Sequence, residues 1–556
     1  IPYGISDFNR LRNDNFYFVD KTIYLPLIER MPSYLSLTRP RRFGKSLFLS
    51  MMRTYYDLLQ RDNFDRYFGD LWIGAHPTDQ RNHYQVLYFD FSKAGCSVPG
   101  DGMMASFNEY SSLVINQFAD DYASFYDPDF KSTVESISSA KAKLSYIELK
   151  AKAKGYPLYL TIDEYDNFTN VILSEHGQKM FHDLTHASGF YREYFKQYKG
   201  MFDRIFLMGV SPVTLDDLSS GYNIDWNIST DSRFNAMMGF SETEVREMFR
   251  YYQENDALPG DIEAMIAEMK PWYDNYCFAR MSLGDDRVFN CDMTLYYLRS
   301  QFDFHRSPEE MVDKNIRTDY SKLKMLARID HDSAHEGSRM STIEEIATKG
   351  EILVNLHTSF PAERVADVDN FRSLLYYYGL LTMCGTRGDR LRMCIPNHCV
   401  REQYFGFLRE YYQQAHPLDL SRLKDQIDDL AYDGVWKPFF ESIACAYREN
   451  SSVRDGMEGE RNLQGFLKAY LALASYYLVE PELEMNYGYC DFFLLPDKQR
   501  YRTLSTATSS NSNTLPAPLP MRNLQCKPTK GIANFFNTAK IKWPDNWRRG
   551  RLFTGC

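Results

Sequence analysis

The stretch Ser33–Asp57, SYLSLTRPRRFGKSLFLSMMRTYYD, runs from an apolar segment through Arg-Pro-Arg-Arg into Phe-Gly-Lys-Ser. It matches most of the pattern G-x-x-x-x-G-K-[ST], in which backbone N–H groups cradle phosphates, the lysine reaches the outer phosphates and the hydroxyl holds Mg²⁺. Gly44, Lys45 and Ser46 fit, whereas Arg39 stands at the position of the first glycine. The stretch is therefore either a phosphate-binding loop or a basic turn that caps a core helix.

Apolar spacing on both sides of the loop favours the phosphate-binding interpretation. Tyr34 to Thr38 suit a short buried strand, and apolar residues from Leu47 to Tyr56 recur at helical spacing. A strand, a loop and a helix in this order aim the helix N-terminus at an anion. Upstream, the segment Phe16–Arg30 predicts a short strand followed by a helix that covers the sheet.

A second signal lies in GYPLYLTIDEYDNF, residues 155–168. Leu158 to Ile162 form a buried type of strand that ends in Asp163 and Glu164. An aspartate at such a strand end suits the Mg²⁺ shell, and a following glutamate can polarise an attacking water. Two acids alone are also typical of a solvated turn, but their order after Lys45 predicts a nucleotide site.

Further strands alternate with helices along the first half of the chain. Tyr84–Ser92 is one, and RIFLMGVSPVTL, residues 204–215, is another that ends near Ser211, where a polar group can sense a terminal phosphate. The alternation predicts an α/β fold, a parallel sheet of the P-loop NTPase type with helices on both faces. Ser241 and Glu244 predict a capping box that starts a helical lid and middle region.

Length and composition narrow the class of protein. A chain of 556 residues exceeds one core and predicts two to four domains. The net charge of -10 and the pI near 5.7 argue against a protein that coats nucleic acid, although a local basic groove stays open. The ten cysteines contain no C-x-x-C pair, and no apolar run is long enough for a bilayer. We therefore expect a soluble, cytoplasmic protein with no membrane partner.

The C-terminal region predicts a second site. Gly456–Leu478 reads as an amphipathic helix, and the next acids and apolar residues alternate, turn at Gly488 and place Asp491 at the head of a buried strand. An acid there suits a metal site, especially with Glu460 on the preceding helix. The alternative is a simple carboxylate at a strand edge. After Arg502 the chain becomes small, polar, Pro-rich and then basic, which is typical of a disordered tail.

These residues resemble a large bacterial family that fuses an AAA-like P-loop ATPase to a C-terminal PD-(D/E)xK nuclease-like domain. The motifs that carry the resemblance are IPYGISDF, YFVDKT, RPRRFGKS, TIDEYDNF, GVSPVTLDDL, RFNAMMGFSE, WYDNYCF and GYCDFFLLPD. The loop RPRRFGKS is the form that this family uses, so the missing first glycine is a family feature. The resemblance covers the chain to about residue 500.

The resemblance implies a role for each candidate residue. Lys45 would lie on the phosphates, Ser46 and Asp163 on Mg²⁺, and Glu164 would be the catalytic residue that orients water. Asp491, with Glu460 in support, would belong to the nuclease metal site. We expect ATP and Mg²⁺ as cofactors, with the nucleotide bound by Arg42, Phe43, Gly44, Lys45, Ser46 and Ser211. Arg39, Arg41 and Arg42 are interpreted either as groups near phosphate or as a solvated basic face.

Four regions follow from this organisation. We predict an ATPase domain over 1–240, a helical lid and middle domain over 241–430, a truncated restriction-endonuclease-like domain over 431–502, and a disordered tail over 503–556. The nuclease family's Glu-x-Lys should follow the strand of Asp491, but no glutamate occurs after Asp497. The sequence thus predicts an ATPase linked to DNA with an incomplete nuclease site. The alternatives are a nucleotide-dependent switch and a P-loop retained as a structural relic, and a homo-oligomer is a further expectation.

The missing motif has an explanation in the coding DNA. Permitted codons for Arg502 to Leu515, read again from the third base of the first codon, give His-Pro-Gln-His-Ser-Tyr-Ile-Ile-Glu-Leu-Lys-Tyr-Leu. With TCN serine codons, Ser509 to Asn513 yield only apolar, apolar, Glu/Lys/Gln, apolar and Glu/Lys/Gln in that frame. This is a strand that carries the absent Glu-x-Lys, so we infer that the tail is a frame-shifted reading. The alternative is a natural disordered tail.

Sequencing the gene across codon 502 tests this inference. We expect one inserted or deleted base, whose correction restores a long open frame that encodes Glu-Leu-Lys. If no single-base change there opens such a frame, the tail is a natural sequence.

Overall fold

The computed structural model describes most of the chain, and this chain forms two compact units. One unit comprises Ile1–Arg339 with Leu353–Val400, and the other comprises Met340–Ile352 with Arg401–Cys556. The description covers residues 1–94, 101–167, 171, 190–213, 226–255, 257–285, 287–313, 323, 326–327, 333–361, 364–365, 367–415, 417–451, 460–474, 476–485, 488–496, 501 and 504. No described helix is both long enough and apolar enough to cross a membrane.

A five-stranded parallel sheet forms the centre of the first unit, as the alternation of strands and helices predicts. Its order is β2-β3-β4-β1-β5. Strand β4 therefore lies between β1 and β3, which carry the two nucleotide signals, and all three strands run in parallel. The strands are β1 (Tyr34–Thr38), β2 (Gln85–Asp90), β3 (Leu158–Asp163), β4 (Arg204–Gly209) and β5 (Trp226–Asn227).

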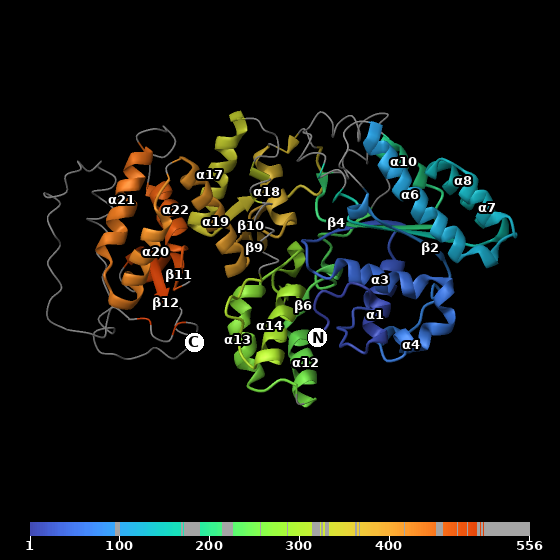
Figure 1. Cartoon of the computed structure of the whole chain (residues 1–556), viewed down its shortest axis with the longest axis horizontal. Coiled ribbons are helices and arrows are strands. Elements are labelled where there is room, and N and C mark those ends of the chain that lie inside the picture. The colour runs from blue at the N-terminus through green and yellow to red at the C-terminus, as the bar shows by residue number, and fades with distance from the viewer. Residues whose placement is uncertain are drawn as a thin grey trace. The chain divides into compact units, whose positions relative to one another are not determined.

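Helices cover both faces of this sheet. Figure 1 shows α1 (Phe8–Asn13), α3 (Lys45–Tyr56) and α4 (Phe64–Phe68) below it, and α6 (Asp101–Asp121), α8 (Ala140–Lys154) and α10 (Phe190–Tyr198) above it. Helix α3 buries Phe48, Met51, Met52 and Tyr55, whose helical spacing was the sequence signal. Short helices complete this part of the chain, namely α2 (Tyr24–Glu29), α5 (Trp72–Ala75) and α7 (Phe130–Ser136).

The strand predicted at the start of Phe16–Arg30 is wrong, whereas the helix after it is confirmed as α2. The aromatic residues of this segment pack against helices and do not pair with a strand. The Phe18 ring lies edge-on to Phe8 at 5.1 Å, and the Tyr17 ring lies 4.8 Å from Tyr251. The consecutive aromatic residues Tyr17 and Phe18 therefore anchor this segment, because each ring packs against a residue of a helix.

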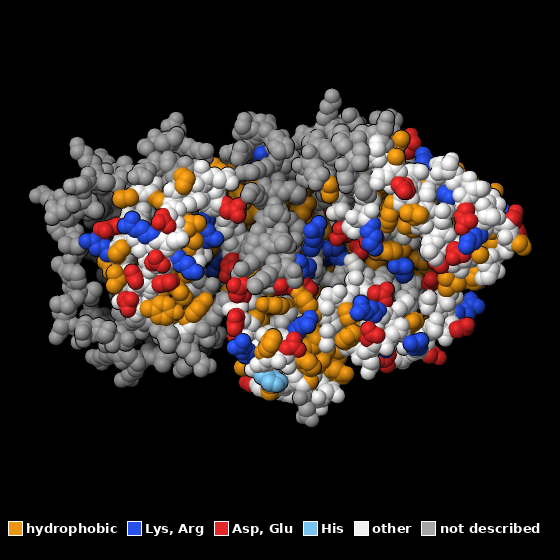
Figure 2. Space-filling model, in the orientation of Figure 1, with side chains coloured by type: hydrophobic (Ala, Val, Ile, Leu, Met, Phe, Trp, Pro, Cys, Tyr) orange, Lys and Arg blue, Asp and Glu red, His pale blue; other side chains and the backbone are white. Residues whose placement is uncertain are grey.

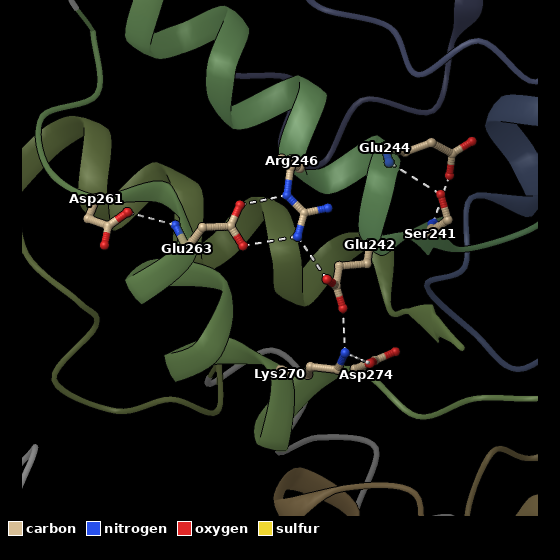
Figure 3. A network of polar contacts seen from close by, with 8 residues as sticks. All are labelled: Ser241, Glu242, Glu244, Arg246, Asp261, Glu263, Lys270 and Asp274. Carbon is tan, nitrogen blue, oxygen red and sulfur yellow. Dashed lines mark hydrogen bonds and ion pairs between the residues drawn. The ribbon is translucent and has the colours of Figure 1, made fainter. Parts of the chain in front are cut away.

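The predicted capping box at the start of α12 (Glu242–Glu254) is confirmed. The Glu244 N–H donates to Ser241 Oγ over 3.2 Å, and the Ser241 N–H donates to Glu244 Oε2 over 2.7 Å. Figure 3 shows how charged residues continue from this cap to α13 (Ile262–Tyr273). There Arg246 Nε donates to Glu263 Oε1 over 2.6 Å, and Lys270 bridges Glu242 and Asp274.

An apolar core lies beneath this charged surface. It joins α12 and α13 to α14 (Cys291–Phe304), with Phe249, Met269 and Leu298 fully buried among its members. The other described α-helices and β-strands up to residue 394 are β6 (Phe240–Ser241), β7 (Val288–Phe289), α17 (Ser333–Lys349), β8 (Glu351–Val354), α18 (Val368–Tyr377), β9 (Thr382–Arg387) and β10 (Arg390–Cys394). Strands β9 and β10 pair in antiparallel fashion.

The C-terminal region contains the predicted helix and hairpin. Strands β11 (Tyr477–Met485) and β12 (Gly488–Pro496) pair in antiparallel fashion, with Met485 opposite Gly488 at the turn. Helix α22 (Glu460–Leu471) precedes them. Three other helices are α19 (His398–Ala415), α20 (Leu420–Asp428) and α21 (Lys437–Ser451). The tail over 503–556, which we infer to be a frame-shifted reading, lies outside the described residues, apart from Leu504.

The end of β4 packs so closely that only glycine fits. A Cβ added to Gly209 would lie 2.3 Å from Asp166 Oδ1 and 2.5 Å from Tyr165 Cε1. We predict that Gly209→Ala lowers the free energy of unfolding by about 1 to 3 kcal/mol, because the loop after β3 must move. Urea unfolding of the full chain measures this change. Gly284→Ala is the matched control, since its new Cβ meets no atom within 4 Å, and equal losses in both variants would contradict the prediction.

Candidate functional site

The loop between β1 and α3 has the backbone that a phosphate loop needs. Gly44 is left-handed, with φ of 86°, and α3 begins directly after it at Lys45. Arg42 is also left-handed, with φ of 67°. Lys45 is buried, and its Nζ donates to the carbonyls of Arg39 over 3.1 Å and Pro40 over 2.9 Å. The N-terminus of α3 and the Lys45 ammonium therefore lie at the same loop, where both favour an anion.

The two predicted Mg²⁺ ligands lie together although 117 positions separate them. Ser46 Oγ donates to Asp163 Oδ2 over 2.6 Å, and the Glu164 N–H donates to Asp163 Oδ1 over 3.0 Å. Asp163 is 2% exposed at the end of β3. A hydroxyl and a carboxylate are the oxygen donors that hold Mg²⁺ at P-loop sites.

Burial and neighbouring opposite charges shift the pKa values of Asp163 and Lys45 in opposite directions. Burial raises the pKa of Asp163, and the Ser46 hydrogen bond and the Lys45 ammonium oppose this shift. Burial lowers the pKa of Lys45, and Asp163, Glu164 and Asp166 oppose it. The ammonium therefore stabilises the carboxylates, and the carboxylates stabilise the ammonium.

Glu164 occupies a conformation that glutamate rarely adopts. Its φ is 48°, in the left-handed region, directly after the last residue of β3. Burial raises the pKa of this carboxyl, while the Arg41 and Lys45 charges lower it. Strained backbone at such a position occurs most often where function requires a side chain to point in one direction. Glu164 is thus placed beside the cationic loop as a candidate base or water-orienting group.

Asp166 is a residue of the site that the sequence reasoning missed. It is 1% exposed, and its carboxylate accepts the N–H groups of Val210 over 3.0 Å and Ser211 over 2.7 Å. The Ser211 side chain in turn hydrogen-bonds Tyr378, whose pKa burial raises. Asp166 therefore fixes the end of β4 beside the end of β3. The available signal was a third acid three residues after Asp163.

Asp90 is a second missed residue, at the end of β2. It lies opposite Asp163 in the parallel register, and its charge contributes to the raised pKa of Asp163. Its own carboxylate accepts from the Ser92 N–H over 3.1 Å and pairs with Lys93 over 3.0 Å. The signal was an acid at the end of the apolar strand QVLYFD.

Each of the three loop arginines has a different environment. Arg39 is 1% exposed, and its guanidinium donates to backbone carbonyls, so the interpretation as a solvated basic face is wrong for it. Arg42 Nη1 donates to Asp292 Oδ2 over 2.5 Å, which ties the loop to α14. Arg41 is exposed and lies within electrostatic range of Glu164. The roles of Arg41 and Arg42 toward phosphate stay predictions.

Buried aromatic residues pack against the loop between β1 and α3. The Phe43 side chain is buried and lies edge-on to Tyr276 at 4.8 Å and Phe278 at 5.5 Å, so only its backbone can face a phosphate. Pro40 packs against Gly379, where an added Cβ would approach Pro40 Cβ to 2.8 Å. These contacts come from segments more than two hundred residues downstream, and no local signal in the loop predicts them.

The donor chemistry of this site fits a nucleotide with Mg²⁺. Gly44 has no side chain that could keep a phosphate away from its backbone, and Lys45 supplies a cation. Ser46 and Asp163 supply two oxygen atoms that can act as metal ligands. The second predicted metal site is different, because the side chains of Asp491 and Glu460 lie outside the described residues, although their backbones fall on β12 and α22. Within the described part of the chain, no three His, Cys, Asp or Glu side chains form a group that could hold a metal ion.

Known proteins resemble the chain in two separate segments. Residues 2–219 match the predicted AAA-ATPase family (AAA-ATPase_like), and residues 458–506 match the PD-(D/E)XK nuclease superfamily. An uncharacterized protein in the vnfD 5′ region of Azotobacter chroococcum mcd 1 is 28% identical over 316 residues, which are 54% of this chain and 52% of that relative. The chain thus spans about half the length of this curated relative.

Two solved structures are similar at low identity. Cdc6p from Pyrobaculum aerophilum is 11% identical with a TM-score of 0.26, and the match covers 70% of this chain and 92% of that chain. The Orc1 protein of Aeropyrum pernix, solved in complex with DNA, is 10% identical with a TM-score of 0.27 and coverages of 71% and 90%. The family matches, the parallel sheet and the loop that joins β1 to α3 agree with one another. The match of residues 2–219 to the AAA-ATPase-like family and of residues 458–506 to the PD-(D/E)XK nuclease superfamily confirms the fusion that the sequence motifs resemble.

Proposed function

We propose that this chain binds ATP with Mg²⁺ and hydrolyses it. The observation that carries the proposal is the 2.6 Å hydrogen bond between Ser46 Oγ and Asp163 Oδ2, with the Lys45 ammonium beside it. A phosphate loop and a strand-end aspartate meet in this way where a metal ion bridges the outer phosphates. The cytoplasm is the compartment that we propose for this reaction.

The residues of the chain divide the work of phosphoryl transfer. The N-terminus of α3 and the Lys45 ammonium attract the phosphates and offset their charge. Ser46 and Asp163 would hold Mg²⁺, which supplies Lewis-acid stabilisation of phosphate charge when bound. Glu164, which directly follows the last residue of β3, orients the water that attacks the terminal phosphate. Ser211 lies at the end of the intervening strand, where its hydroxyl can sense that phosphate.

DNA is the partner that we propose for the whole chain, with a homo-oligomer as the acting form. Basic and acidic side chains are interspersed on the face in Figure 2, and the net charge is -10, so DNA contact would be local. A second candidate function is a nucleotide-dependent switch without nuclease activity. The lack of any glutamate after Asp497 favours it, because Asp491 with Glu460 is an incomplete set of groups for phosphodiester cleavage.

ATP hydrolysis by the purified chain, with and without duplex DNA, separates these functions. Turnover stimulated by DNA supports the ATPase that acts with DNA. Slow turnover that DNA leaves unchanged supports the switch. Failure to bind ATP contradicts both and leaves the loop as a structural relic.

Two substitutions test the assigned roles within the site. We predict that Lys45→Ala loses ATP binding by about 100-fold or more, because the phosphates lose their nearest cation. Glu164→Gln should keep binding and slow hydrolysis by about 100-fold, since it changes only the group that orients water. Equilibrium binding and steady-state turnover measure the two effects. Equal turnover in the wild type and Glu164→Gln would remove Glu164 from the mechanism.

The ion pair between Arg42 and Asp292 allows a test of the arginine. We predict that Arg42→Gln lowers ATP affinity about tenfold, because it removes a phosphate contact. Asp292→Asn is the control, since it breaks the same pair and leaves the guanidinium available for phosphate. Its expected loss is small. Equal losses in both variants, with no further loss in the double variant, would instead mean that Arg42 only ties the loop to α14.

A further inference from the structure

Arg39 lies at the base of the phosphate loop, where the loop pattern has its first glycine. Its guanidinium is enclosed by backbone carbonyls and one ring. Nη1 donates to Thr38 O over 2.9 Å and to Ser229 O over 2.6 Å, and Nη2 donates to Phe234 O over 3.0 Å. The guanidinium carbon lies 4.4 Å from the centre of the Phe278 ring. The side chain is therefore held in one position by four separate contacts.

Within the described part of the chain, this buried cation lies beside no acidic partner. Among the described residues, no carboxylate forms a hydrogen bond or an ion pair with Arg39, and its Nε is buried without a partner. After burial, the largest influences on the pKa of Arg39 come from three tyrosines and a cysteine. Burial lowers the pKa of Arg39 to about 10, so the guanidinium remains charged at neutral pH. A buried charge that is not paired normally destabilises a fold.

The backbone of Arg39 also belongs to the phosphate loop. Its N–H donates to Gly209 O over 3.1 Å, which ties the loop to the end of β4. Its carbonyl accepts from Lys45 Nζ over 3.1 Å. The guanidinium is thus fixed to the loop that would receive phosphate, but it is too deeply buried to touch a ligand.

We propose that Arg39 is a positioning residue whose fixed positive charge lies beneath the loop, and that the polyphosphate of a nucleoside triphosphate is its countercharge. This inference rests on the proposed nucleotide binding. An acidic neighbour would neutralise the guanidinium and remove its attraction for phosphate. Carbonyl oxygens and a ring face satisfy its donors and leave its net charge in place. Because charges interact over longer distances inside a protein than in water, the buried cation favours ligands with more phosphates.

The test compares ATP, ADP and AMP on the full chain, with Mg²⁺ present and Glu164→Gln as the background that prevents turnover. We expect Arg39→Met to weaken ATP binding about tenfold, ADP binding less and AMP binding least. Equal losses for the three nucleotides would mean that Arg39 only supports the loop, and would overturn the inference. Absence of ATP binding in the unchanged background would overturn the proposed function together with it.

A matched control and a second variant keep the test decisive. Arg53→Met makes the same change at an arginine of α3, whose guanidinium lies 3.9 Å from the centre of the Tyr88 ring and whose position is about 12 Å along the helix from Lys45. It should alter the three affinities equally. Arg39→Lys keeps a charge with a lower intrinsic pKa, so its ATP affinity should fall at a lower pH than that of the wild type, in which the pKa of Arg39 is about 10. A flat profile in Arg39→Lys would contradict the inference even if Arg39→Met does not fold.

Discussion

The hydrogen bond from Ser46 to Asp163 joins α3 to the end of β3. The turn after β3 packs against the end of the neighbouring strand β4, where a Cβ added to Gly209 would lie 2.3 Å from Asp166 Oδ1. Asp166 in turn fixes the chain after β4 through two backbone N–H groups. The absence of a side chain thus matters as much as the polar pair.

Three arginines within four positions show that the guanidinium group can occupy three different environments in one loop. Arg39 is enclosed by carbonyls, Arg42 is paired with Asp292, and Arg41 is exposed near Glu164. Guanidinium groups suit all three settings, because they remain charged and present several donors in a plane. A loop that replaces its first glycine by arginine therefore gains a side chain that the sheet can enclose.

The sequence was sufficient for features that depend on neighbouring residues. Strand β1, helix α3, the capping box of Ser241 and the hairpin of β11 and β12 all follow from local spacing. The burial of Arg39 does not, because its partners Ser229 and Phe234 lie 190 and 195 positions away. Asp90 and Asp166 were missed because a single acidic residue in a sequence does not indicate which distant residues it will contact. The domain boundaries and the tail after Arg502 stay predictions.

The contact between Pro40 and Gly379 has a consequence for the smallest folding unit. The AAA-ATPase-like match ends at residue 219, yet the loop at its centre rests on Tyr276, Phe278 and Gly379. A chain cut at residue 219 would expose Phe43 and the apolar side of Pro40 to water and would invite aggregation. The recognisable homology and the autonomous folding unit therefore have different boundaries, and any excised ATPase must extend past residue 379.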